Sequence, residues 1–201
     1  MKIISHRRNT IAELEATNQN YGVEVDIRSK GNRLIIHHDP FVFGECFYKW
    51  LNVYQHGTLI LNVKEEGLEE RLIDLMISKG ITDYFFLDQS FPFLVRWAQK
   101  GEHRCAVRVS EFEAVETAVS LAGKIDWVWV DCFTKFPLSS QDYLRLKNAK
   151  LKICLVSPEL QGRDAILEIS KMAEILNERN ILADAVCTKC PELWEKTGLC
   201  K

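Results

Sequence analysis

The chain has 201 residues, with 26 Lys and Arg against 28 Asp and Glu, and hence a formal net charge of −2. Hydrophobic residues make up 47% and charged residues 27%, a globular composition that excludes disordered, collagen-like and coiled-coil chains. The near-neutral charge argues against nucleic acid or an anionic membrane as the main partner, because both require a basic excess. The longest apolar runs, such as Trp127–Val130 and Ile153–Val156, fall far short of the ~20 residues of a membrane span.

The amino-terminal segment becomes polar within five residues, which predicts a cytoplasmic protein without a secretory signal. The seven cysteines are an odd number, and we expect them to be reduced thiols. Cys187-x-x-Cys190 matches half of a zinc site, but no second CxxC completes it, so a pair of buried thiols is the preferred interpretation.

Short β-rich runs recur at fairly even spacing, and most are apolar on both faces, as expected for parallel strands covered by helices. The runs are Lys2–Ser5, Val23–Ile27, Leu34–His37, Leu59–Val63, Tyr84–Leu87, Cys105–Val109, Trp127–Val130, Lys152–Val156 and Ala185–Cys187. Segments with helical periodicity separate them. Thr10-x-x-Glu13 and Ser110-x-x-Glu113 have the spacing of capping boxes at helix starts. Strand followed by helix, about eight times over, predicts a (β/α)8 barrel or a doubly wound sheet.

Two observations favour the barrel. The turn after the first run lacks the glycine-rich dinucleotide fingerprint of an open doubly wound sheet. Polar residues also follow many different strands, at ends that converge on one mouth in a barrel: His6, Asp26, His38, Lys64, Asp88, Arg108, Asp131 and Glu159. We therefore predict a small, single-domain α/β fold, a (β/α)8 TIM-type barrel over residues 1–201. Gly31-Asn32 predicts a tight turn, so the second and third runs are expected to form a hairpin.

Glu24-Val25-Asp26 lies within a predicted strand, where alternation puts both carboxylates on one face, about 6–7 Å apart at Cα. Two such groups aimed into a cavity repel each other unless a cation lies between them, so the pair is a candidate hard-metal site. A solvated strand face is the alternative. The hairpin turn would bring His37, His38 or Asp39 opposite Glu24.

His6 and Arg7 follow the first strand. An imidazole titrates near pH 7 and can transfer a proton, whereas a guanidinium matches two oxygens of a phosphate. Alone, the pair would indicate a solvated loop. Here, however, His-Arg, Glu-x-Asp and His-Asp occur in that order at strand ends within the first 39 residues, which is unexpected by chance.

The segments His6-Arg7, Glu24-x-Asp26 and His38-Asp39-Pro40 resemble the signature of the glycerophosphodiester phosphodiesterase family, among the barrel-fold, phospholipase C-like phosphodiesterases. The resemblance is strong over residues 4–40 and weak elsewhere. It implies that His6 and His38 are the catalytic acid and base, that Glu24 and Asp26 hold a divalent cation, Mg2+ in preference to Ca2+, and that Arg7 binds phosphate.

The sequence departs from that family in two places. Arg8 stands where the family has glycine. The family's middle strand reads Asn-x-Glu-x-Lys, with Glu as third metal ligand, whereas this chain has Asn62-Val63-Lys64-Glu65-Glu66. Three interpretations follow: Glu66 completes the metal site from further along the strand, Lys64 neutralises phosphate in place of part of the cation, or the site is inactive.

Arg108, Asp131 and Glu159, together with Asp88, are predicted to face the mouth and contact substrate; capping interactions or salt bridges between strands are the alternative. Residues 41–57 form an aromatic-rich insertion that would be either a lid over the site or a plug at the side of the barrel.

The predicted function is metal-dependent hydrolysis of a small hydrophilic phosphodiester, such as a glycerophosphodiester. One histidine would deprotonate the attacking hydroxyl and the other would protonate the leaving alkoxide. The alternatives are a catalytically inactive barrel that binds phosphodiesters, a phosphodiesterase of cell-surface polysaccharide metabolism, and a barrel with unrelated metabolic chemistry. The sequence leaves the oligomeric state open.

Overall fold

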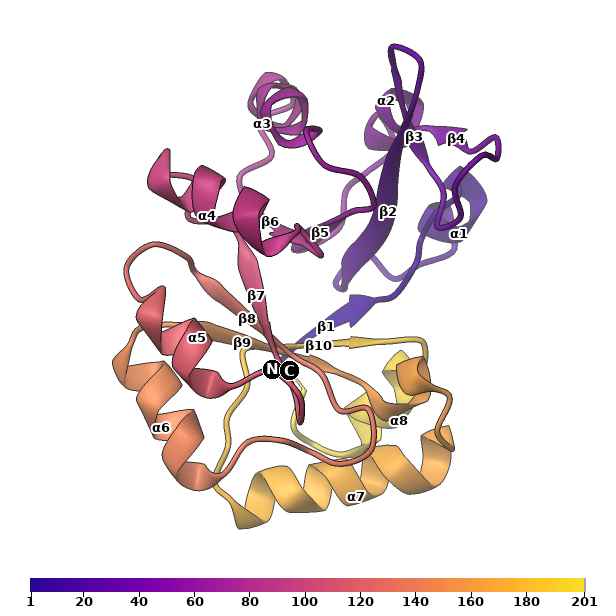
Figure 1. Ribbon diagram of the computed structural model, residues 1–201. Helices are drawn as coiled ribbons and strands as arrows, with labels where there is room; N and C mark the ends of the chain where they lie inside the picture. Colours follow the sequence, from indigo (N-terminus) through magenta and orange to yellow (C-terminus); the bar gives the residue numbers. More distant parts are fainter. Residues whose placement is uncertain (201) are drawn as a thin grey trace.

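The computed structural model describes residues 1–200, and its central feature is a ring of eight parallel strands surrounded by helices (Figure 1). The strands are β1 (Lys2–Ser5), β2 (Gly22–Lys30), β5 (Leu59–Val63), β6 (Tyr84–Leu87), β7 (Ala106–Val109), β8 (Trp127–Val130), β9 (Lys152–Val156) and β10 (Ala185–Thr188). Neighbours in chain order pair in parallel, and β10 pairs with β1. A single bridge between Phe86 and Cys105 joins β6 to β7 and closes the ring. The predicted (β/α)8 barrel is confirmed.

The extra strand run belongs to a hairpin outside the ring. β3 (Arg33–Ile36) pairs antiparallel with the second half of β2, and β4 (Glu45–Cys46) pairs antiparallel with β3. Gly31, at the turn, has a positive φ of 57°, which glycine adopts without steric cost. The predicted hairpin is therefore confirmed. Beyond β3, the His37 N–H donates to the carbonyl of Asp26 at 3.0 Å, so the histidine-containing loop lies beside the carboxylate strand.

The helices cover the outside of the ring, and most are short, which is how 201 residues suffice for this fold. They are α1 (Ile11–Glu15), α2 (Phe47–Leu51), α3 (Glu69–Ser78), α4 (Phe91–Gln99), α5 (Val115–Ser120), α6 (Ser140–Asn148), α7 (Ala165–Glu178) and α8 (Pro191–Lys196), with a 3₁₀ turn at Pro158–Gln161. The capping box at Thr10 and Glu13 is confirmed. The one expected at Ser110 was wrong: Ser110 bonds Glu113 within a loop, and α5 starts only at Val115.

Two apolar layers stabilise the barrel. The larger lies between strands and helices, and the smaller fills the inside of the ring. Within the inner layer, the rings of Phe85 and Trp127 stack at 4.5 Å. Because strand side chains alternate between faces, the inward positions of each strand are apolar in the interior and give way to polar residues at the carboxyl end. The middle of the barrel is thus filled by apolar side chains.

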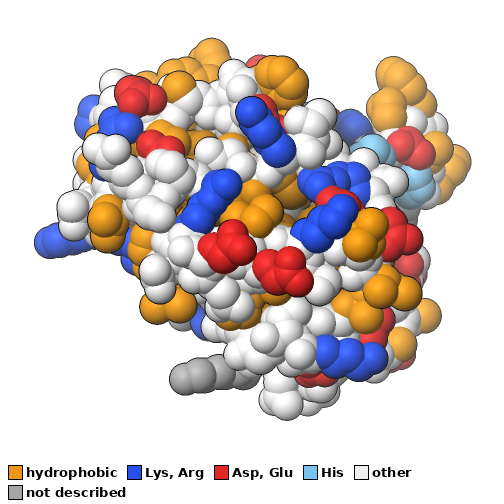
Figure 2. Space-filling model, turned by 90° about the horizontal axis from the view of Figure 1, so that it is seen from below, with side chains coloured by type: hydrophobic (Ala, Val, Ile, Leu, Met, Phe, Trp, Pro, Cys, Tyr) orange, Lys and Arg blue, Asp and Glu red, His pale blue; other side chains and the backbone are white. Residues whose placement is uncertain are grey.

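Two expectations about the whole chain can be compared with the structure. In residues 1–200 no helix combines the length and apolar character needed to cross a membrane; the predicted cytoplasmic location stays a prediction. All seven cysteines are free thiols. On the face drawn in Figure 2, acidic and basic side chains are interspersed, in keeping with the small net charge.

Gly22 sits where β2 passes closest to the start of β5. A Cβ added there would lie 2.5 Å from the backbone oxygen of Thr58. Because backbone cannot shift cheaply in a packed barrel, we expect Gly22→Ala to lower the free energy of unfolding by about 1–3 kcal/mol. Denaturant unfolding would measure this, with the exposed Ile77→Ala as a control that changes little. An unchanged midpoint for Gly22→Ala would contradict the packing described.

Candidate active site

Charged side chains at the barrel mouth form a continuous chain of alternating sign. The chain runs from Arg7 to Asp26 (3.5 Å), Asp26 to Lys64 (3.3 Å), Lys64 to Asp88 (3.1 Å), Asp88 to Arg108, and Arg108 to Asp131 (3.7 Å). These residues come from the ends of β1, β2, β5, β6, β7 and β8. The predicted convergence of polar strand ends therefore holds for most of the ring.

Glu24 lies almost fully buried on the inner face of β2. Its carboxylate accepts the Arg7 N–H at 2.7 Å and the Asn62 side-chain amide at 2.8 Å. Burial, and then the charge of Asp26, raise the pKa of Glu24 to about 7. Arg7 adopts a left-handed backbone with φ of 52°, which is uncommon for a residue with a side chain. This conformation accompanies the contact between its N–H and Glu24.

Asp26, the second carboxylate of the pair, is completely buried. Asn9 holds it on two sides: the Asn9 amide donates to the Asp26 carboxylate at 2.8 Å, and the Asp26 N–H donates to the Asn9 side-chain oxygen at 3.0 Å. Arg7 and Lys64 supply the neighbouring positive charges. Sequence analysis missed Asn9, whose only signal was its place three residues after His6.

His6 enters the site directly after β1. Its side chain is 13% exposed, and its Nε2 lies 3.9 Å from a carboxylate oxygen of Glu24. Burial, followed by the charge of Arg7, lowers the pKa of His6 to about 3. Its Nδ1 is buried and makes no hydrogen bond within residues 1–200. The imidazole is thus neutral near pH 7 and has a free ring nitrogen.

His38 lies further out, with its side chain 43% exposed and its Nδ1 2.8 Å from the carboxylate of Asp39. Arg28 fixes this loop by donating two hydrogen bonds to the His38 carbonyl and one to the Lys64 carbonyl. Arg28 was missed from the sequence. His38 and Arg7 line one cleft of about 540 Å³. No hydrogen bond or ion pair in residues 1–200 joins His38 to His6.

Glu66 does not reach the two buried carboxylates. β5 ends at Val63, and a turn with Gly67 at φ 88° follows, so the strand alternation that would place Glu66 inward stops after Lys64. Glu66 is exposed. No three His, Cys, Asp or Glu side chains in the described chain form a group able to hold a metal. Within residues 1–200, Glu66 is thus not grouped with Glu24 and Asp26, and its part in a metal site stays a prediction.

The oxygens beside β2 nevertheless suit a hard cation. Asn62 donates to Glu24, and its own side-chain oxygen is buried without a hydrogen bond in residues 1–200. The Oδ1 oxygen of Asp26 is also buried without a hydrogen bond there, and its charged neighbour is the Lys64 ammonium at 3.3 Å. Mg2+ is commonly held by one or two carboxylates together with waters and phosphate oxygens, whereas Ca2+ takes six to eight oxygen ligands. Two carboxylates and one amide fit Mg2+ better.

The other residues predicted to contact substrate form ion pairs and hydrogen bonds within the protein. Arg108 bridges Asp88 and Asp131, and Asp131 also accepts the Gln161 amide at 2.7 Å. Burial raises the pKa of Asp131 although Arg108 opposes it. Glu159 accepts the Thr188 hydroxyl at 2.6 Å and the Lys189 N–H at 2.9 Å, which anchors the loop after β10. These side chains thus form salt bridges and caps within the protein, and their contact with a substrate stays a prediction.

The aromatic-rich insertion divides into two parts. Phe47, Trp50 and Leu51 of α2 are buried in the outer core, and the Trp50 indole donates to the Arg8 carbonyl at 2.8 Å. This part plugs the side of the barrel and supports the His6–Arg8 loop. Phe41 and Phe43, which follow His38, are exposed.

Comparisons with known proteins identify the fold. No family model matches the chain, and no curated protein matches its sequence. A glycerophosphodiester phosphodiesterase from Agrobacterium tumefaciens has a similar structure, with a TM-score of 0.65 and 14% identity over 98% of this chain and 99% of that one. A glycerophosphoryl diester phosphodiesterase from Parabacteroides distasonis gives 0.67, at 11% identity over 98% and 85%.

The chain has the fold of the glycerophosphodiester phosphodiesterases. The same fold also resembles that of the tryptophan synthase α-subunit of Pyrococcus furiosus, with a TM-score of 0.57 and 11% identity over 98% of this chain and 91% of that one. Identities this low establish the barrel and no more, so the chemistry has to be argued from the residues at the mouth.

Glu111 holds two mouth loops together. Its carboxylate, in the loop after β7, accepts the N–H groups of Phe133, Thr134 and Lys135 at 3.1, 2.6 and 2.7 Å. Burial alone would raise the pKa of Glu111, but these backbone donors outweigh it and lower the pKa to about 2.

Because the pKa of Glu111 is lower in the folded protein, its stabilising effect is present above its ordinary value of 4.5 and is lost as the pH falls toward about 2. We expect Glu111→Gln to be less stable than the wild type at pH 7, and the difference between the two proteins to be smaller at pH 2.5. Urea unfolding at both pH values measures this. A difference of equal size at pH 7 and pH 2.5 would contradict it.

Proposed function

We propose that the protein is a phosphoric diester hydrolase of the glycerophosphodiester phosphodiesterase type, acting on a small hydrophilic phosphodiester. The observation that carries the proposal is the arrangement of His6, Arg7 and the Glu24–Asp26 pair on one side of the mouth of a barrel with that family's fold. A proton-transfer group, a phosphate-binding cation and two metal-binding carboxylates would serve one phosphodiester.

Positive charge at the mouth would bind the phosphate. Arg7 is partly exposed and lies against Asp26, and Lys64 lies between Asp26 and Asp88 with its side chain 15% exposed. A phosphate entering beside them would meet two cations already oriented by buried carboxylates, so little reorganisation would be needed. Arg108, Asp131 and Glu159 would contact the substrate's alcohol groups from the opposite side of the mouth.

Hydrolysis would then require two proton transfers. One of His6 and His38 would take the proton of the attacking water, or of a neighbouring substrate hydroxyl, while the new P–O bond forms. The other would give a proton to the leaving alkoxide as the old P–O bond breaks. The side chains of His6 and His38 are 13% and 43% exposed, so both imidazoles would be available to a substrate that spans the mouth.

Glu24 and Asp26 would hold a divalent cation, with Asn62 as the neighbouring oxygen donor in place of a third carboxylate. When bound, Mg2+ would neutralise charge on the phosphoryl group. Because the Asn62 side chain is neutral, these three ligands would carry one negative charge fewer than three carboxylates. Lys64 adds a positive charge beside the same phosphate, so part of the neutralisation would come from the protein itself.

Hydrolysis of bis(p-nitrophenyl) phosphate tests the proposal directly. We expect turnover that is abolished by EDTA and restored by Mg2+, and a loss of at least about a hundredfold in kcat for His6→Ala and for His38→Ala, as is usual when an acid–base group is removed. His103→Ala is the matched control, because His103 is exposed and precedes β7 at the opposite end of the barrel. Full activity of either His6→Ala or His38→Ala would refute its assignment.

Metal binding can be measured without turnover. Titration with Mn2+, followed by electron paramagnetic resonance, should show one site, weakened more than about tenfold in Asp26→Ala. Asn62→Asp should bind Mn2+ more tightly because it adds a carboxylate to the set. Glu66→Ala should bind as the wild type does, and a loss of affinity in this variant would instead make Glu66 the third ligand.

One observation favours a second function, that of a barrel that binds phosphodiesters without cleaving them. Among residues 1–200, no third acidic side chain is grouped with Glu24 and Asp26. Such a protein would bind glycerophosphate diesters equally well with EDTA and with Mg2+, and His6→Ala would still bind them. The same titrations therefore separate the two functions.

A further inference from the structure

The barrel wall has one weak seam, between β6 and β7. Continuous ladders join the other neighbouring strands of the ring, whereas in residues 1–200 only the bridge between Phe86 and Cys105 joins β6 to β7. Beyond this bridge the two strands part toward the mouth. Asp88 then turns with a positive φ of 58°, a conformation that aspartate adopts more readily than most residues.

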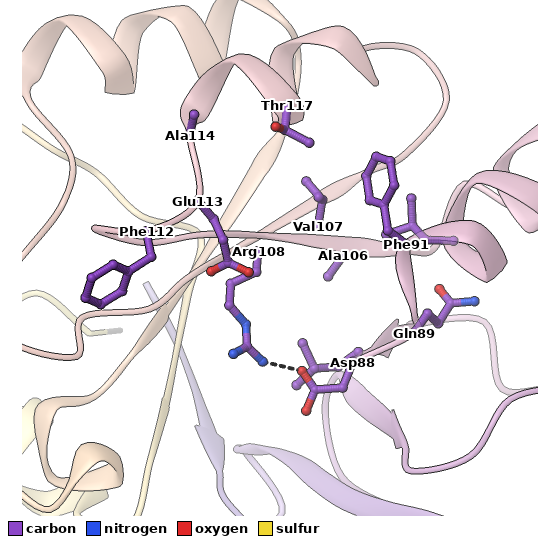
Figure 3. A pocket seen from close by; sticks show the side chains of 12 residues that line it. Asp88, Gln89, Phe91, Ala106, Val107, Arg108, Phe112, Glu113, Ala114 and Thr117 are labelled. Atoms are coloured by element: carbon purple, nitrogen blue, oxygen red, sulfur yellow. Dashed lines mark hydrogen bonds and ion pairs between the residues drawn. The ribbon is translucent and has the colours of Figure 1, made fainter.

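A pocket of about 580 Å³ occupies the gap left by the parted strands. Leu87 and Asp88 line one side, Ala106 to Arg108 line the other, and the starts of α4 and α5 supply Phe91 and Thr117 (Figure 3). We call this space the seam pocket. Its remaining lining residues are Gln89, Leu94, Phe112, Glu113 and Ala114.

The seam pocket adjoins the candidate active site. Asp88 and Arg108, which form an ion pair at the floor of the view in Figure 3, are also members of the charge chain across the mouth. Asp88 lies 3.1 Å from Lys64, and Lys64 in turn lies 3.3 Å from Asp26. A phosphate held beside Arg7 and Lys64 would thus have its ester group directed across Asp88 toward the seam pocket.

The lining combines hydroxyl-binding groups with exposed aromatic rings. Asp88 and Glu113 supply carboxylates, Gln89 supplies an amide, and Arg108 supplies a guanidinium, so donors and acceptors are both present for vicinal hydroxyls. Phe91 is 50% exposed and Phe112 is 77% exposed. The faces of such rings attract the polarised C–H groups of a sugar, because the ring face carries negative charge density.

The size and lining of the seam pocket limit the kind of alcohol group that it would bind. Small-molecule sites typically measure roughly 300–1,000 Å³ and enclose most of the ligand. A glycerol unit has no ring face to stack on an aromatic side chain, whereas a hexose presents both such a face and several hydroxyls. A lipid chain would displace water from the carboxylates, the amide and the guanidinium and would offer them no hydrogen bond in return, which is costly in a pocket.

We propose that the seam pocket binds a hexose-sized, polyhydroxylated alcohol group of the phosphodiester substrate and so determines which diesters are hydrolysed. This inference rests on the proposed phosphodiesterase function. Arg108 and Asp88 would contact the sugar nearest the phosphate, and Phe112 would form the outer wall. The phosphate and the second, smaller alcohol would remain at the mouth.

Two glycerol phosphodiesters test the inference, one esterified to methanol and the other to glucose through its O6. We expect the glucose diester to have a KM at least about tenfold lower. Thr117→Phe fills the seam pocket and Phe112→Ala removes its outer wall, so each should raise KM for the glucose diester about tenfold and leave the methyl diester unchanged. Leu182→Ala, an exposed apolar residue before β10 at the opposite end of the barrel, is the control.

The outcomes separate the two proposals. If both diesters are hydrolysed equally well and neither variant alters either KM, the seam pocket is not the subsite and the phosphodiesterase function stands. If neither diester is hydrolysed, saturation-transfer NMR decides the binding question alone. Contacts from the glucose protons that disappear in Thr117→Phe would support the seam pocket even though the enzyme proposal fails. Absence of such contacts in the wild type would overturn the inference.

Discussion

The burial of two carboxylates, Glu24 and Asp26, inside the end of a barrel is the constraint on which the rest of the mouth depends. An ionised carboxylate removed from water is costly unless it is paired and hydrogen-bonded. The protein meets this demand with backbone and side-chain donors from Arg7, Asn9 and Asn62 and with the charge of Lys64. Each donor comes from a loop or strand end that must be held in place, which explains the left-handed Arg7 and the anchoring of Trp50 on the Arg8 carbonyl.

The same demand spreads around the ring. Lys64 forms ion pairs with both Asp26 and Asp88, and Asp88 forms a second ion pair with Arg108. Burial would raise the pKa of Asp88, but these two cations lower it below its ordinary value, so it remains a carboxylate. Single exposed ion pairs contribute little to stability. Several ion pairs that share side chains around a partly buried mouth nevertheless hold those side chains in fixed orientations. The result is that Lys64 and Arg7 are held beside two buried carboxyl groups, and the proposed binding of a phosphate with a metal ion rests on this arrangement.

Much of this was predictable from the sequence because it follows from alternation and turn chemistry. The apolar strand runs predicted the barrel, and Gly31-Asn32 predicted the hairpin. The alternation of side chains along a strand predicted that Glu24 and Asp26 lie on one face. The features that sequence analysis missed or predicted wrongly have a common cause, because each depends on contacts formed only in the tertiary structure. Extending the alternation to Glu66 assumed that β5 continues past Val63, and no local signal shows where a strand stops. The side chains of Asn9 and Arg28 act across loops, and the Ser110–Glu113 spacing is satisfied equally well by a loop.

The weak seam between β6 and β7 is connected to the candidate active site by the charged side chains of the mouth. Where two strands part, backbone donors and acceptors lose their partners, which makes an open seam unfavourable unless side chains or a ligand compensate. Here Asp88 and Arg108 span the gap with an ion pair, and both belong to the charge chain that orients Lys64. A group that enters the seam therefore touches the charges that orient Lys64, the lysine proposed to bind phosphate. Recognition of one alcohol and positioning of the phosphate would depend on the same two side chains, so a pocket outside the ring could govern which diester reaches the carboxylates inside it.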